Sequence, residues 1–95
     1  MSRSYTDRFT GAMLGLACGD ALGAPVEFFS KEELVARFGR RTEMVGGGHF
    51  TRWRPGEWTD DTGMALCVAE GILATPDDPV SEIGNRFLAW RKSAK

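Results

Sequence analysis

Hydroxyl and carboxylate side chains gather in one short stretch, Thr59, Asp60 and Asp61, which we call the 59–61 triplet. Oxygen ligands of this kind suit hard divalent cations such as Mg²⁺, Mn²⁺ or Ca²⁺. The same residues also fit an ordinary helix start, because Thr59 can cap the first turn and acidic side chains there complement the helix dipole. Neighbouring helical side chains diverge by about 100°, so the two aspartates would serve two ions, or one ligand and one supporting contact. Taken alone, the triplet favours the helix-start interpretation.

Glu27 is the second candidate, because its neighbours are unusual for a surface carboxylate. It follows a proline and a valine and precedes two phenylalanines. The side chain is therefore either exposed on a turn or partly buried with a partner. A bound cation would be such a partner, and partial burial would tune the carboxylate for proton transfer. We expect Asp20 to hydrogen-bond the backbone at the end of the first helix, and a direct metal role is its less favoured alternative.

Four helical patterns must position these side chains. The first spans residues 5–22, and Ser4 and Asp7 before it have capping-box spacing. Glycines recur along it every four residues, and each costs about 1 kcal/mol relative to alanine inside a helix. Such a stripe favours close packing against another helix, with approach of a ligand as the alternative. Its members are Gly11, Gly15, Gly19 and Gly23.

The other three helices have recognisable boundaries. A short helix follows a capping box that begins at Ser30, and Gly39 is its expected stop. The third helix begins at the 59–61 triplet and is apolar around much of its circumference, which is typical of a helix surrounded by protein. The fourth helix is expected to have Asp78 as its cap and Pro79 at its first helical position.

Residues 40–58 show no convincing periodicity and no strand pattern of useful length. Irregular connections this long are usually functional or disordered, and the aromatic residues here favour an ordered loop over a site. His49, the only histidine, could contact substrate but is more often an ordinary polar loop residue. Trp53 and Trp58 could stack on a base, although anchoring of the loop is the favoured use. The glycine run 46–48 is a poor phosphate cradle because it precedes no helix and lacks a P-loop lysine.

Composition narrows the class of protein. The 95 residues are 42% apolar and 26% charged, which is typical of one small globular domain and not of a disordered tail. A net charge of −1 disfavours a dedicated nucleic-acid binder. The amino terminus has no signal-peptide pattern, and the nearly apolar run 11–18 is too short to span a bilayer, so we expect a cytoplasmic protein. Cys18 and Cys67 lie within apolar helical patterns and are expected to be buried, reduced thiols.

Two stretches together resemble the ADP-ribosylglycohydrolase family. They are GAMLGLACGDALGAPVEF and, about thirty residues later, PGEWTDDTGMALCVAEGIL, and the resemblance covers roughly residues 9–90. It implies an all-α fold, a roughly orthogonal multi-helix bundle that holds two divalent cations, Mg²⁺ or Mn²⁺. It also implies hydrolysis of the N- or O-glycosidic bond between ADP-ribose and a protein side chain. The substrate would then be an ADP-ribosylated protein or a small ADP-ribose derivative, with no nucleic-acid or membrane partner.

The resemblance also assigns residues. Thr59, Asp60 and Asp61 match the family's amino-terminal metal ligands, and Glu27 matches a glutamate near the metals that serves as ligand, gate or acid/base. The family's second acidic motif, of the Asp-x-Asp-Thr type, and its phosphate-binding loop have no counterpart in these 95 residues. We therefore expect residues 1–95 to be the amino-terminal part of a single domain, with half of the metal site.

Two consequences follow from this incompleteness. The stretch alone would not complete the active site, and the apolar third helix would require a carboxyl-terminal portion or self-association to cover it. The alternative function is a non-catalytic binding or structural relative, similar to the family's crystallins, on the same helical scaffold.

Overall fold

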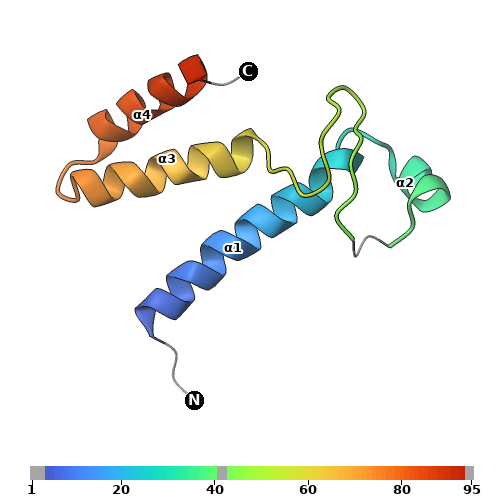
Figure 1. Cartoon of the computed structure of the whole chain (residues 1–95), viewed down its shortest axis with the longest axis horizontal. Helices are drawn as coiled ribbons and strands as arrows, with labels where there is room; N and C mark the ends of the chain where they lie inside the picture. The colour runs from blue at the N-terminus through green and yellow to red at the C-terminus, as the bar shows by residue number, and fades with distance from the viewer. Residues whose placement is uncertain (1–3, 41–42, 94–95) are drawn as a thin grey trace. The chain divides into compact units, whose positions relative to one another are not determined.

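The computed structural model describes residues 4–40 and 43–93, and its regular elements there are helices (Figure 1). In chain order they are α1 (Tyr5–Gly23), the 3₁₀ turn η1 (Ala24–Val26), α2 (Lys31–Arg37), α3 (Asp60–Ala74) and α4 (Val80–Ser93). The predicted all-α class is confirmed. The chain forms two compact units, Met1–Thr59 and Asp60–Lys95, and each is described by itself.

Helix α1 begins where the sequence predicts. The Ser4 hydroxyl oxygen accepts a hydrogen bond from the Asp7 backbone N–H at 3.0 Å, which satisfies one donor of the first turn. At the other end, the Ala24 N–H bonds to the Asp20 carbonyl, and the 3₁₀ turn that begins at Ala24 contains Pro25. The expected close packing of the glycine stripe is not made within the described residues: a Cβ added at any of its four positions would meet nothing within 4 Å.

Helix α1 and η1 together also bear on the membrane expectation. The 22-residue segment Tyr5–Val26 contains an 18-residue window with a mean hydropathy of 1.3 and is long and apolar enough to cross a bilayer by length and composition. The run 11–18 that the sequence indicated is only part of this longer apolar segment. Core helices of soluble proteins and signal sequences meet the same criterion, so it assigns no membrane role.

Helix α2 is short and has well-defined ends. The Ser30 hydroxyl accepts from the Glu33 N–H at 3.1 Å, and the Glu33 carboxylate accepts from the Ser30 N–H at 3.3 Å, which forms the predicted capping box. These hydrogen bonds to Ser30 lower the pKa of Glu33 below its ordinary value. Gly39 follows with φ of 61°, the left-handed conformation that ends helices most easily in glycine.

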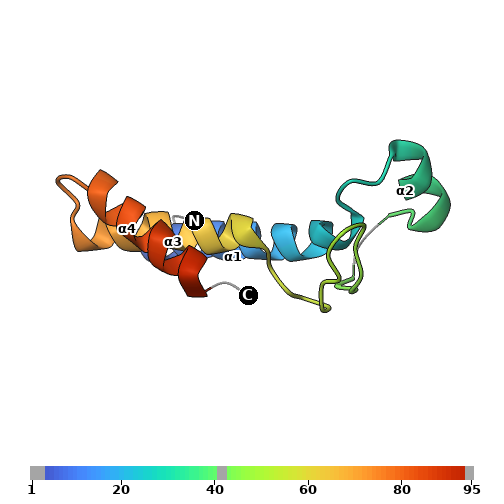
Figure 2. The same ribbon diagram turned by 90° about the horizontal axis from the view of Figure 1, so that it is seen from above.

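The second unit is a helical hairpin in which α3 and α4 run antiparallel and side by side (Figures 1 and 2). Two glycines of α3 permit this approach. A Cβ on Gly63 would lie 2.7 Å from the Trp90 Nε1 atom, and one on Gly71 would overlap the Ile83 side chain and lie 3.0 Å from its backbone nitrogen. Within the hairpin, close helix packing therefore uses these two glycines of α3.

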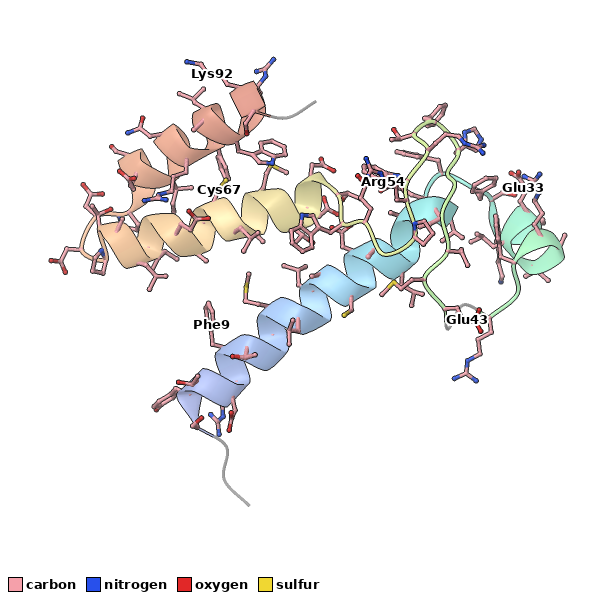
Figure 3. The ribbon with its side chains drawn as sticks, in the orientation of Figure 1. Phe9, Glu33, Glu43, Arg54, Cys67 and Lys92 are labelled. Atoms are coloured by element: carbon pink, nitrogen blue, oxygen red, sulfur yellow. The ribbon has the colours of Figure 1, made fainter. Side chains whose placement is uncertain are left out.

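Packing within the hairpin also buries Cys67. Cys67 is buried on the side of α3 that faces α4, and its Sγ lies 3.6 Å from the Arg86 carbonyl oxygen (Figure 3). Cys18 is exposed, so the expectation of burial was right for one thiol and wrong for the other; neither forms a disulfide. Helix α4 begins at Val80, one residue later than predicted, and the Pro79 carbonyl accepts its first helical hydrogen bond from Ile83 at 2.8 Å.

Candidate functional site

Asp20 and Thr59 form the most specific polar contact of the first unit. The Thr59 hydroxyl donates to Asp20 Oδ1 at 2.7 Å, and the Thr59 backbone N–H donates to Oδ2 at 2.9 Å. The two residues are 39 positions apart, and the contact is part-buried. One carboxylate from the last turn of α1 therefore fixes both the backbone and the side chain of the residue that directly precedes α3.

The two aspartates of the 59–61 triplet occupy the first turn of α3. Both Asp60 and Asp61 are exposed, and their position favours negative charge because unpaired N–H groups and the helix dipole meet there. Thr62, the next residue, is 2% exposed. The chain thus changes from solvent-exposed carboxylates to a buried hydroxyl within one turn of α3.

Glu27 lies at the end of η1, on a turn that exposes it. Its backbone N–H bonds to the Ala24 carbonyl at 3.3 Å, and its carboxylate makes no hydrogen bond or ion pair with the part of the chain that the structure describes. Phe28 follows with φ of 74°, a conformation that is costly for a bulky residue. Of the two alternatives that the sequence left open, exposure on a turn is therefore what the structure shows.

Aromatic contacts tie this turn to the long loop. The Phe28 and Phe50 ring centroids lie 5.1 Å apart, and His49 lies 4.4 Å from Phe50 and 5.0 Å from Phe29. The favoured interpretation of His49 as a loop residue agrees with this packing. The loop thus packs against the turn that carries Glu27, as expected of an ordered loop.

The loop itself is held by backbone contacts that require glycine. Gly47 and Trp53 form an isolated antiparallel bridge with two hydrogen bonds of 2.9 Å. A Cβ on Gly46 would lie 2.6 Å from the Trp53 carbonyl oxygen. Farther along, the Arg54 N–H donates to the Glu57 carboxylate at 2.8 Å; Arg54 is labelled in Figure 3. The glycine run therefore serves a tight loop. Residues 41–42 of the loop lie outside the described residues.

The donor chemistry at the 59–61 triplet fits a divalent cation, although the ligand set is incomplete. A hydroxyl that gives its proton to a carboxylate presents its oxygen as an acceptor to other groups, which is what a metal ligand needs. Carboxylates are the other preferred ligands of Mg²⁺ and Mn²⁺. No three His, Cys, Asp or Glu side chains are grouped for metal binding within residues 4–40 and 43–93. Water or further oxygen ligands would have to fill the coordination shell.

The predicted site residues are therefore placed in two groups. Glu27 and Thr59 belong to the first unit, and Asp60 and Asp61 begin the second. Convergence of Glu27 with the two aspartates stays a prediction. The sequence interpretation missed the partner of Asp20, which is the Thr59 side chain as well as its backbone. The available signal was an acidic residue in the last turn of a helix, where the dipole disfavours it.

Comparison with known proteins gives a consistent family. The sequence model of the family described as ADP-ribosylglycohydrolase matches residues 1–94. The chain is 46% identical over 90 residues to ADP-ribosyl-[dinitrogen reductase] glycohydrolase of Rhodospirillum rubrum, covering 95% of this chain and 30% of the relative. It is 42% identical over 84 residues to ADP-ribosylarginine hydrolase Tri1 of Serratia proteamaculans, covering 88% of this chain and 21% of that protein.

A solved structure gives the same result for the fold. The chain superposes on an ADP-ribosylglycohydrolase-related protein complex with a TM-score of 0.76 and 48% sequence identity. The match covers 93% of this chain and 29% of the other. The 95 residues thus span less than a third of the length of these relatives.

Proposed function

We propose, from the premise that this chain belongs to the ADP-ribosylglycohydrolase family, that it supplies the amino-terminal part of a hydrolase that removes ADP-ribose from protein side chains. The observation that carries the proposal is the 59–61 triplet at the start of α3, whose Thr59 hydroxyl is held by Asp20. The names of the two relatives, both of which remove ADP-ribosyl groups, support the reaction class.

Four residues would hold the cations: Thr59, Asp60, Asp61 and Glu27. The chemistry that two bound Mg²⁺ or Mn²⁺ ions supply is orientation of the ribose hydroxyls and activation of a water for attack at the anomeric carbon. Glu27, exposed on its turn, accepts the proton that the attacking water loses. Asp60 and Asp61 contribute negative charge at a helix start that already tolerates it. The substrate is an ADP-ribosylated protein or a small ADP-ribose derivative.

A thermal-shift titration of the full-length protein with Mn²⁺, Mg²⁺ and ADP-ribose tests this proposal. Ligands that bind the folded state raise its stability by about 2.7 kcal/mol at a concentration of 100 Kd. We expect a clear rise in Tm with each cation, and loss of that rise in Asp60→Ala. Asp77→Ala, which removes an exposed carboxylate of the α3–α4 turn, is the matched control and should respond as the wild type does.

Two outcomes would count against the proposal. Absence of a cation-dependent rise in the wild type, or an unchanged rise in Asp60→Ala, would remove the metal site from the 59–61 triplet. Cation binding without release of ADP-ribose from any ADP-ribosylated protein or small derivative would favour the non-catalytic alternative.

A further inference from the structure

Asp20 stands where a carboxylate is unfavourable for its own helix. It lies in the last turn of α1, which contains no basic residue, and the negative end of the helix dipole is at that terminus. Aspartate is also a weaker helix former than alanine or leucine. The side chain is half-buried, so solvent offsets only part of this cost. The two hydrogen bonds that Asp20 accepts from Thr59 offset this cost.

The type of acceptor matters for the direction of the Thr59 hydroxyl. An ionised carboxylate has two oxygens that only accept, so both Thr59 groups in contact with it must donate. The hydroxyl proton therefore points at Asp20 Oδ1 at 2.7 Å, while the N–H points at Oδ2 at 2.9 Å. A carboxamide in the same place offers one oxygen and one NH₂ group. Asparagine at position 20 would therefore lose one of the two hydrogen bonds to Thr59, or its NH₂ group would donate to the Thr59 hydroxyl. In the second case the hydroxyl proton would point away from residue 20.

We propose that Asp20 is a positioning residue: it takes the Thr59 hydroxyl proton so that Oγ1 can face a divalent cation as an oxygen ligand. The inference depends on the proposed function, because it assumes that Thr59 is a ligand. It assigns to Asp20 an action through Thr59 and no direct contact with the ion. The two-point contact also fixes the backbone at the residue before Asp60, where α3 begins.

The test is a double-mutant cycle on the full-length protein, with Mn²⁺ alone as the probe and its Kd measured by titration calorimetry. Asp20→Asn keeps the shape of the side chain and is expected to weaken Mn²⁺ binding about 10- to 100-fold, as loss of a supporting contact to a ligand typically does. Thr59→Val removes the hydroxyl and is expected to have an effect at least as large. Adding Asp20→Asn to Thr59→Val should change the Kd by less than about threefold, because coupled residues are non-additive.

Two controls separate this action from a general structural role. Asp7→Asn changes another carboxylate of α1, in its first turn, and should leave the Kd unchanged. Thr59→Ser keeps the hydroxyl and should retain Mn²⁺ binding within about threefold, whereas a role in packing alone would favour Val, which has the shape of Thr, over the smaller Ser. Circular dichroism checks that each variant keeps its helices. If Asp20→Asn does not fold, amide exchange of Thr59 in the wild type replaces the cycle, and fast exchange there would overturn the bond itself.

The outcomes distinguish this inference from the proposed function. Suppose that the wild type binds Mn²⁺ and that Asp20→Asn weakens this binding equally whether residue 59 is Thr or Val. That result overturns the inference and leaves the proposed function standing. Unchanged affinity in Asp20→Asn does the same. A wild type that binds no Mn²⁺ overturns the proposed function, and the role of Asp20 with it.

Discussion

At the scale of single residues, a carboxylate can serve as a ligand or as the group that directs a ligand. Asp20 and Asp60 are the same residue type in different circumstances: Asp20 is half-buried and accepts two hydrogen bonds from one residue, whereas Asp60 is exposed at a helix start. A hydrogen bond to a charged group contributes about 1.5–3 kcal/mol, so the Asp20–Thr59 pair is a substantial constraint on the chain at that point. Asp60, by contrast, is exposed to solvent in the first turn of α3.

Glu27 leads to a prediction about turnover. We expect Glu27→Gln in the full-length protein to lower kcat by about 10²- to 10⁴-fold, because the amide cannot take a proton from water. The measurement is steady-state release of ADP-ribose from an ADP-ribosylated protein. Glu32→Gln, which changes an exposed glutamate of α2, is the control and should keep wild-type kinetics. A Glu27→Gln enzyme with normal kcat would remove this residue from the chemistry.

The sequence predicts residue types more readily than partners. Thr59, Asp60 and Asp61 could be selected because hydroxyl and carboxylate groups in sequence suggest both a helix start and an oxygen-rich site. The contact between Asp20 and Thr59 could not, since it joins positions 39 residues apart and depends on how the loop between them folds. The predicted burial of Cys18 was wrong for a related reason. An apolar pattern identifies one face of a helix, but burial of that face depends on the elements that pack against it.

At the scale of elements, local signals fixed most helix boundaries. The capping box at Ser30 and the stop at Gly39 formed as predicted, and Ser4 caps α1 through one hydrogen bond from Asp7, because these contacts join groups within a few residues of each other. Packing was less predictable. A Cβ added along the regular glycine stripe of α1 would meet nothing within 4 Å in the described residues, whereas Gly63 and Gly71, which belong to no regular stripe, lie where α3 and α4 meet. The spacing of glycines in the sequence predicts that they share one face of a helix, but it does not predict which element packs against that face.

This contrast predicts opposite effects for two glycine-to-alanine changes. Gly71→Ala should destabilise the α3–α4 hairpin by about 1–3 kcal/mol, because its new methyl group would overlap Ile83 and force the helices apart. Gly84→Ala, on α4 with nothing within 4 Å of an added Cβ, should stabilise by up to about 1 kcal/mol through helix propensity. Urea unfolding of the full-length protein measures both. Equal effects of the two changes would contradict the assigned packing.

At the scale of the whole molecule, the described residues bury little apolar side chain. Their buried hydrophobic residues are Ala21, Ala24 and Cys67, all small. Large apolar side chains remain exposed on every long helix, among them Leu14 at 60% and Leu73 at 77%. Apolar surface of this extent is normally covered by protein. The relatives are more than three times as long as these 95 residues.

We therefore expect the 95-residue chain on its own to self-associate, because association is the available way to remove its exposed apolar faces from water. Sedimentation velocity over a range of concentrations should show a rising average mass. Leu73→Gln should lower the association, because it makes polar a side chain of α3 that is 77% exposed. Lys92→Gln, a change at an exposed polar position of α4, should leave it unaltered. A folded monomer of constant mass at all concentrations would show that these faces tolerate water and that the helices need no cover.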